Sequence, residues 1–178
     1  MAGAGAVARP HRLLLVGMMG AGKTTVGQLA AARLGWPYLD SDAEVVAATG
    51  KTVPEIFAES GEAAFRAEET KALERALALD PVVVSVAGGA VLSEENRRLI
   101  RGGGTVVWLR AQVATLVARV GDGAGRPLLE DGAAAALARL DAVRRPLYAE
   151  VADTVIDVEG RQPAEVASAA IAALGAEP

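Results

Sequence analysis

The sequence has no cysteine and a single histidine, His11, among its 178 residues. Without cysteine the chain can form neither disulfides nor a thiolate metal site, and one histidine excludes His-ligated metal sites and histidine-based catalytic triads. A cysteine-free chain fits a reducing compartment, and residues 1–12 contain no apolar segment typical of a secretory signal. We therefore expect a cytoplasmic protein.

Aromatic residues, basic charge and long apolar runs are also scarce. Only 3% of the residues are aromatic, and 18 basic against 22 acidic residues leave a net charge of −4. Nucleic-acid-binding proteins usually combine a basic surface with aromatic residues for base stacking, so we expect no nucleic-acid partner. No run approaches the roughly 18 consecutive apolar residues of a membrane-spanning helix, so we expect no membrane partner.

Apolar residues, by contrast, make up 52% of the chain, and they form short strand-like runs that alternate with segments of helical periodicity. This alternation predicts an α/β fold in which a parallel sheet is covered by helices on both faces. The predicted strands are 13–16, 38–39, 82–86, 105–109 and 154–158. The predicted helices are 23–34, 42–49, 53–59, 61–79, 93–101, 112–120, 133–149 and 163–174.

The chain shows no internal repeat, no low-complexity linker and no sign of a second domain. We predict a flexible N-terminal tail at 1–11, followed by a single domain at 12–175. The stretch at 121–125, which reads GDGAG, is too short for an interdomain linker. Its composition is typical of hinge material.

Residues 17–24 read GMMGAGKT and match the phosphate-binding pattern G-x-x-x-x-G-K-[ST]. The pattern follows an apolar strand directly and opens a helix. Its glycines let backbone N–H groups surround a phosphate, and the helix amino terminus adds partial positive charge. Lys23 is expected to reach the β- and γ-phosphates, and the Thr24 hydroxyl is expected to ligate Mg²⁺. The pattern thus predicts a nucleoside triphosphate site.

The metal ion is also expected to have a carboxylate beside it. The candidates are the aspartates of Asp40-Ser41-Asp42, which follows the short strand at 38–39. If the backbone stays extended there, the two aspartates point in different directions, one toward the metal and the other toward an acceptor. The alternative is that Asp42 caps a helix beginning at Ala43 while Asp40 is a solvated loop residue. Capping and catalysis are compatible, so both interpretations stay open.

Further motifs follow in order, and together they resemble the shikimate kinase family over about residues 12–174. After the phosphate loop and D-x-D come GEAAFR at 61–66, GGAV at 88–91, RPLL at 126–129 and RRPLY at 144–148. The resemblance implies a P-loop kinase of the nucleoside-monophosphate-kinase-like type, a three-layer αβα fold with five parallel strands in the order 2-3-1-4-5. It also implies ATP-dependent phosphorylation of the shikimate 3-hydroxyl on the way to chorismate and aromatic amino acids, by a monomer.

The resemblance further implies a role for each matching residue. Asp42 would bind the shikimate hydroxyls and accept a proton, and Arg66 and Arg144 would hold the shikimate carboxylate. A mobile lid at about 121–132 would carry Arg126 onto the transferred phosphoryl group. The implied catalytic residues are Lys23, Asp42 and Arg126. The implied ATP-binding residues are Gly20, Ala21, Gly22, Lys23, Thr24, Thr25, Arg119, Arg126 and Pro163, of which Arg119 and Pro163 would sandwich adenine. The implied acceptor-binding residues are Asp42, Arg66, Gly88, Gly89 and Arg144, and the implied Mg²⁺ ligands are Thr24 and Asp40.

Several of these residues also have a plain structural interpretation. Arg66 and Glu69 have the spacing of a surface ion pair on a helix, although in the family context Glu69 orients Arg66. Arg144 could lie on a solvated helix face. Ala87 stands where the family usually has a first glycine, and alanine disfavours positive φ, so we expect a small backbone shift and an effect on acceptor affinity.

Two other functions compete with the kinase interpretation. One is another small-molecule kinase of the same architecture, because fold does not determine function. The other is an ATP-binding regulatory module without turnover. The joint presence of five residues argues against a module that only binds: Lys23, Thr24, Asp40, Asp42 and Arg126.

Overall fold

The computed structural model describes residues 10–120 and 132–175, which form a five-stranded parallel sheet in the order β2-β3-β1-β4-β5. The predicted sheet and its strand order are confirmed. The register places Leu14 of β1 beside Val84 of β3 and Val106 of β4. The strands are β1 (Arg12–Val16), β2 (Tyr38–Asp40), β3 (Val82–Ser85), β4 (Thr105–Arg110) and β5 (Thr154–Asp157).

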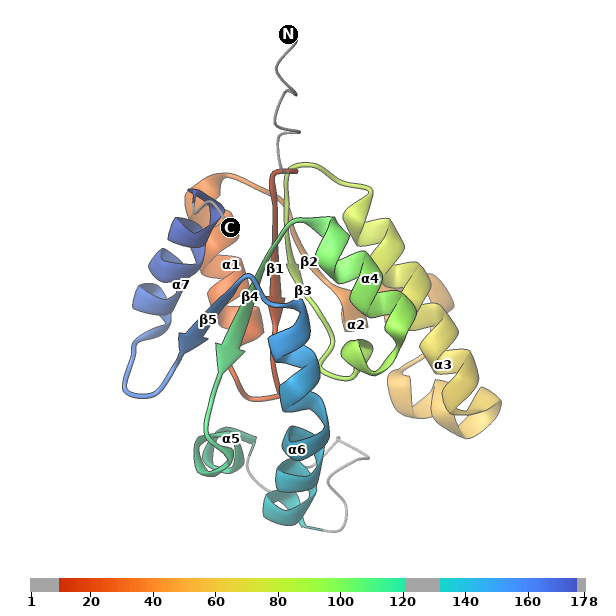
Figure 1. Ribbon diagram of the computed structural model, residues 1–178. Coiled ribbons are helices and arrows are strands. Elements are labelled where there is room, and N and C mark those ends of the chain that lie inside the picture. Colours follow the sequence, from red (N-terminus) through yellow and green to blue (C-terminus); the bar gives the residue numbers. More distant parts are fainter. Residues whose placement is uncertain (1–9, 121–131, 176–178) are drawn as a thin grey trace, which may run out of the picture.

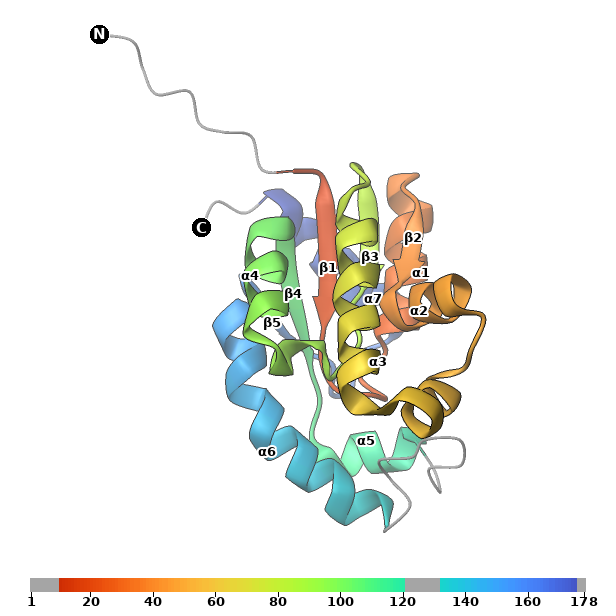
Figure 2. The same cartoon turned by 90° about the vertical axis from the view of Figure 1, so that its right-hand side faces the viewer.

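Helices cover both faces of the sheet, as Figures 1 and 2 show. On one face α1 packs against α7, and on the other lie α3, α4 and α6. No helix in the described part of the chain is long and apolar enough to cross a membrane. The helices are α1 (Lys23–Leu34), α2 (Ser41–Thr49), α3 (Val53–Leu77), α4 (Glu94–Gly103), α5 (Val113–Val120), α6 (Ala133–Val151) and α7 (Pro163–Ala172), with 3₁₀ turns η1 (Ala90–Leu92) and η3 (Ala173–Gly175).

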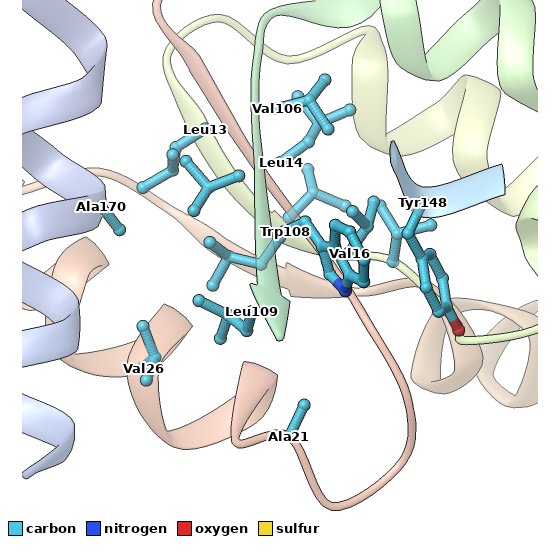
Figure 3. Close-up of a cluster of buried hydrophobic side chains, with 14 of the residues drawn as sticks. Leu13, Leu14, Val16, Ala21, Val26, Val106, Trp108, Leu109, Tyr148 and Ala170 are labelled. Atoms are coloured by element: carbon cyan, nitrogen blue, oxygen red, sulfur yellow. The ribbon is translucent and has the colours of Figure 1, made fainter. Parts of the chain in front are cut away.

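The central strands are buried on both faces, which explains their uninterrupted apolar sequences. Leu13, Leu14 and Leu15 have no exposed surface. Figure 3 shows this core from β1 and β4 outward, including the rings of Trp108 and Tyr148, whose centroids lie 5.8 Å apart. A smaller core lies between α2 and α3, apart from the sheet, and consists of Val45, Ile56, Phe65 and Ala72 with Val53 and Phe57 packed against it.

The helical segment between Val53 and Leu77 is interrupted at Gly61. The sequence predicts two helices, 53–59 and 61–79, and the structure confirms the break between them, because Gly61 has a non-helical backbone with φ 79° and ψ 176°. A residue with a side chain is strained at such a φ, so glycine permits the change of direction. The kink carries the first part of α3 away from the sheet and toward its carboxyl edge (Figure 2).

Parallel strands deliver their following loops to one edge, and three such loops carry the predicted motifs. The phosphate loop follows β1, Asp40 ends β2, and Ala87 to Gly89 follow β3. The predicted lid, with Arg126, lies outside the described residues, as does most of the predicted tail. Within the described part of that tail, the His11 backbone N–H donates to Asp80 Oδ1 at 3.0 Å.

Candidate active site

A cavity of about 480 Å³ opens at the carboxyl edge of the sheet. It lies between that edge and the small core of α2 and α3, and residues from five separate parts of the sequence line it. Phosphate-loop, aspartate, arginine and glycine-turn residues predicted from the sequence therefore meet in one place. The lining residues are Met19, Gly20, Gly22, Lys23, Thr24, Thr25, Asp40, Asp42, Val53, Pro54, Phe57, Phe65, Arg66, Glu69, Val86, Ala87, Gly88, Gly89 and Arg144.

The phosphate loop has the backbone geometry that its glycines were expected to allow. Gly22, at the N-cap of α1, has a φ of 101°, and Gly17 has a φ of 145°. A Cβ on Gly17 would lie 2.6 Å from the Leu109 carbonyl oxygen, so no other residue fits there. Lys23 Nζ donates to the carbonyl oxygens of Gly17 at 2.7 Å and Met18 at 3.0 Å, which holds its charge beside the loop.

The two aspartates face the same cavity, but the backbone between them is not extended. Asp40, not Asp42, is the N-cap: its Oδ1 accepts from the backbone N–H groups of Asp42 at 3.0 Å and Ala43 at 3.2 Å. The helix therefore begins at Ser41, and Asp42 lies in its first turn. Burial raises the pKa of Asp42, the neighbouring Asp40 raises it further, and Lys23 and Arg66 oppose the rise.

Arg66 is held by a buried carboxylate rather than by a surface ion pair. Its Nη1 donates to both oxygens of Glu69, at 3.2 and 3.0 Å, and its Nη2 lies 3.3 Å from Glu62. Glu69 is only 1% exposed, and burial raises its pKa, while the Arg66 and Arg144 guanidinium groups oppose the rise. A buried carboxylate that bridges to Arg66 fixes the direction of the guanidinium, so the orienting role suggested for Glu69 agrees with the geometry.

Arg144 is buried at 3% exposure, so its interpretation as part of a solvated helix face is wrong. Its guanidinium lies over the glycine turn, within 3.4 Å of the positions that side chains on Gly88 and Gly89 would take. Its Nε has no hydrogen-bond partner among the described residues. A buried cation with an unmatched donor, on the wall of the cavity that contains Arg66, suits an anionic ligand.

The glycine turn accommodates its alanine without strain. No residue other than glycine has a positive φ among those the structure describes, so Ala87 adopts an ordinary conformation. Its backbone N–H donates to the buried Ser41 Oγ at 2.8 Å, and Tyr148 donates its hydroxyl to the Gly88 carbonyl at 2.7 Å. The reason for expecting a backbone shift at Ala87 is therefore absent.

Both the sequence and the fold of this chain are similar to those of known kinases. The family model described as shikimate kinase matches residues 19–175. The chain belongs to the shikimate kinase family. A shikimate kinase from Frankia casuarinae is 49% identical over 163 residues, which are 92% of this chain and 72% of that protein. The structure of shikimate kinase from Acinetobacter baumannii in complex with shikimate superposes with a TM-score of 0.86 at 38% identity and covers 90% of each chain.

The same fold also occurs in kinases of other substrates. A gluconokinase from Sinorhizobium meliloti superposes with a TM-score of 0.57 at 24% identity, over 93% of each chain, and this likeness concerns the fold alone. The family match and the curated relatives, by contrast, establish the activity as that of a shikimate kinase. The family match therefore favours neither of the two competing interpretations, another small-molecule kinase or an ATP-binding module without turnover.

Two predicted adenine-binding residues of this shikimate kinase lie outside the cavity wall. Arg119 of α5 donates to the carbonyl oxygens of Gly20 at 3.1 Å and Ala21 at 3.4 Å, so it is bonded to the backbone of the phosphate loop. Pro163 is the exposed first residue of α7. Their sandwiching of adenine stays a prediction.

Sequence reasoning missed several residues that organise the site. Four hydroxyl groups form hydrogen bonds with the backbone or with one another near the cavity. Tyr38 donates to Ser85, Ser85 and Tyr148 donate to backbone carbonyls, and Ser41 accepts from the Ala87 N–H. One signal was available, because Ser85 is a polar residue at the end of the apolar run 82–84. A buried hydroxyl there must find a partner, although the sequence does not say which.

Proposed function

We propose that this chain transfers the γ-phosphoryl group of ATP to the 3-hydroxyl of shikimate by means of the residues that line the cavity. The observation that carries the proposal is that the phosphate loop, Asp42 and the pair Arg66 and Arg144 share one cavity. A phosphate site, a proton acceptor and a carboxylate site are what a kinase of a hydroxylated carboxylic acid needs.

On the donor side, the glycine-rich loop and Lys23 bind the phosphates of ATP. Mg²⁺ accompanies the nucleotide and neutralises charge on the phosphates. The Thr24 hydroxyl and the Asp40 carboxylate line the cavity beside Lys23, and such hard oxygen groups suit this ion. The described residues contain no group of three or more histidine, cysteine, aspartate or glutamate side chains that could hold a metal. The donor set therefore fits an ion that takes most of its ligands from phosphate and water.

On the acceptor side, Arg66 and Arg144 bind the shikimate carboxylate, because a guanidinium matches the planar shape of a carboxylate. Gly88 and Gly89 border the shikimate ring. A Cβ on Gly89 would lie 2.9 Å from Arg66 Nη1, and one on Gly88 would lie 3.4 Å from Arg144 Nη1, so glycine leaves room for both guanidinium groups. Asp42 accepts the proton of the 3-hydroxyl as its oxygen attacks the γ-phosphorus. Its raised pKa favours this role because a more basic carboxylate accepts a proton more readily.

Arg126 completes the proposal as the lid residue that offsets charge on the transferred phosphoryl group. It lies outside the described residues, so its role, like the monomeric state and the cytoplasmic location, stays a prediction from the sequence. Closure of a lid would also keep water from hydrolysing ATP.

The test is a coupled measurement of ADP release with Mg²⁺-ATP, with and without shikimate, alongside gluconate and nucleoside monophosphates. We expect release that depends on shikimate alone. Release with gluconate or a nucleoside monophosphate would favour another kinase of the same fold. ATP binding without release for any acceptor would favour the regulatory module.

A further inference from the structure

The turn at residues 87–89 pairs most of its backbone hydrogen-bonding groups within the protein. All three carbonyl oxygens accept a hydrogen bond, and the Ala87 N–H donates to Ser41 Oγ. Among the residues that the structure describes, the N–H groups of Gly88 and Gly89 have no such partner. Both glycines are half-buried and line the cavity, so these two donors are available to a ligand. The donors to the three carbonyls are, in chain order, the Ala90 N–H at 3.0 Å, the Tyr148 hydroxyl at 2.7 Å and the Leu92 N–H at 3.1 Å.

Tyr148 belongs to the buried core and not to the cavity wall. It has no exposed surface, and its ring packs beside Trp108 (Figure 3). Burial raises the pKa of Tyr148, while the Arg144 guanidinium opposes the rise, so the phenol keeps the proton that it donates. Arg144 precedes Tyr148 by four residues and therefore lies on the same face of α6. The helix thus presents two groups to the turn, a guanidinium on the cavity wall and a hydroxyl bonded to the backbone.

The hydrogen bond from Tyr148 acts on a peptide group that faces two ways. The Gly88 carbonyl and the Gly89 N–H belong to the same peptide unit, which is trans and planar, so they point in opposite directions. Holding the carbonyl toward Tyr148 therefore holds the N–H away from it. Neither glycine has a Cβ, so this peptide plane would otherwise rotate with little steric resistance.

Gly89 also lies directly against the two arginines of the acceptor site. A Cβ at this position would lie 2.9 Å from Arg66 Nη1 and 3.3 Å from Arg144 Nη2. An anion bound by these guanidinium groups is therefore next to the Gly89 backbone. A backbone N–H in such a place can add a charge-assisted hydrogen bond to a carboxylate.

We propose that Tyr148 is a positioning residue for the acceptor: its hydroxyl holds the Gly88–Gly89 peptide so that the Gly89 N–H donates to the substrate carboxylate. This inference rests on the proposed function, because it concerns the carboxylate side of the same site. Tyr148 itself does not line the cavity, so it acts only through the backbone. A hydrogen bond to the carboxylate is made equally before and during phosphoryl transfer, so its loss raises KM and leaves kcat unchanged.

A purely structural role for Tyr148 makes a different prediction. If the hydroxyl only fastens α6 to the turn, its loss lowers the melting temperature and either spares the affinity for shikimate or weakens the binding of both substrates equally. If it orients the peptide, its loss weakens the binding of shikimate selectively. The Gly89 amide then also loses its response to the ligand.

The experiment compares the wild type with Tyr148→Phe, which removes one oxygen atom and keeps the ring beside Trp108. Calorimetric titration of the full chain should show the Kd for shikimate rising about 3- to 10-fold, the range for one hydrogen bond. The Kd for a non-hydrolysable ATP analogue with Mg²⁺, and kcat at saturating shikimate, should stay within about 2-fold of the wild type. In ¹⁵N NMR spectra, shikimate should shift the Gly89 amide signal of the wild type, and this shift should shrink in the variant.

Thr49→Val is the matched control, because it also removes a hydroxyl that donates to a backbone carbonyl, that of Val45 at 2.8 Å, outside the cavity wall. We expect it to change neither Kd. An unchanged Kd for shikimate in Tyr148→Phe, or equal losses for both ligands, would overturn the positioning role while the proposed function stands. A weaker Kd with the full Gly89 shift would also overturn it, since the effect would then act through Arg144. A wild-type protein that does not bind shikimate would contradict the proposed function itself, and this inference with it.

Discussion

At the scale of single residues, Asp42 combines the surroundings of a proton acceptor with a position in a rigid element. Its backbone N–H is tied to Asp40, and it lies in the first turn of α2, where the helix dipole favours negative charge. Burial nevertheless raises its pKa, which shows that the cost of desolvation exceeds the attraction of Lys23 and Arg66. An aspartate in this state accepts a proton more readily than one in water.

Asp42→Asn tests this role, since asparagine keeps the size of the side chain and cannot accept the proton. We expect shikimate-dependent turnover to fall about 10²- to 10⁴-fold, the usual contribution of a general base. ATP affinity, measured by calorimetry, is expected to persist. The control is Asp157→Asn, which removes an exposed carboxylate paired with Arg110 on β5 and is expected to leave turnover unchanged. Near-normal kcat in Asp42→Asn would mean that the residue only orients the hydroxyl.

Glu69 shows how one buried charge can hold another in place. Glu69→Gln keeps the shape of the side chain but removes the charge that faces Arg66, leaving the guanidinium partly unpaired. We expect the KM for shikimate to rise at least about 10-fold and the free energy of unfolding to fall by about 1–3 kcal/mol. Steady-state kinetics and urea denaturation measure the two effects. Lys71 and Glu68 form an exposed pair on the same helix, so Glu68→Gln is the matched control and should change neither quantity. Equal KM values for Glu69→Gln and the wild type would remove Glu69 from the acceptor site.

At the scale of helices and strands, α3 depends on a single backbone conformation at Gly61. A Cβ at this glycine would meet nothing within 4 Å, so a substitution there tests the positive φ alone. We expect Gly61→Ala to destabilise the fold by about 1–3 kcal/mol, the cost of a positive φ with an extended ψ, which is essentially confined to glycine. Gly102 in α4 is the matched control, because it also has open space but ordinary helical geometry. Gly102→Ala should stabilise by about 0.5–1 kcal/mol. Thermal and urea unfolding check both signs, and equal effects would show that the kink is not constrained.

The elements themselves were largely predictable from the sequence, because their signals are local. Apolar runs mark the buried strands, and glycine or proline marks most helix ends. The sequence offers Asp42 as a possible N-cap, whereas the structure uses Asp40. Both are good capping residues, and only the backbone turn at Ser41 decides between them. Burial of Glu69 and Arg144 could not be foreseen, since spacing along a helix does not show which face the rest of the chain covers.

At the scale of the whole molecule, the cavity lies between two cores of unequal size. The sheet and its helices form the large core, whereas α2 and the first part of α3 share the small one. The phosphate-loop residues line the cavity from the side of the large core, while Val53, Pro54 and Phe57 line it from the side of the small core. A segment with so few buried contacts opens more easily than the sheet, so its stability should respond most to a ligand that bridges the two.

Hydrogen–deuterium exchange tests this division of the molecule. Saturating shikimate should slow exchange most in residues 53–66, by up to about 100-fold at a ligand concentration of 100 times Kd, because openings that break the site must first release the ligand. A non-hydrolysable ATP analogue should instead protect residues 17–25 most, since its phosphates contact the loop after β1. Each ligand thus serves as the control for the other. Uniform protection by both ligands would mean that the two cores open as one unit, and protection of 53–66 by the ATP analogue alone would place the acceptor site elsewhere.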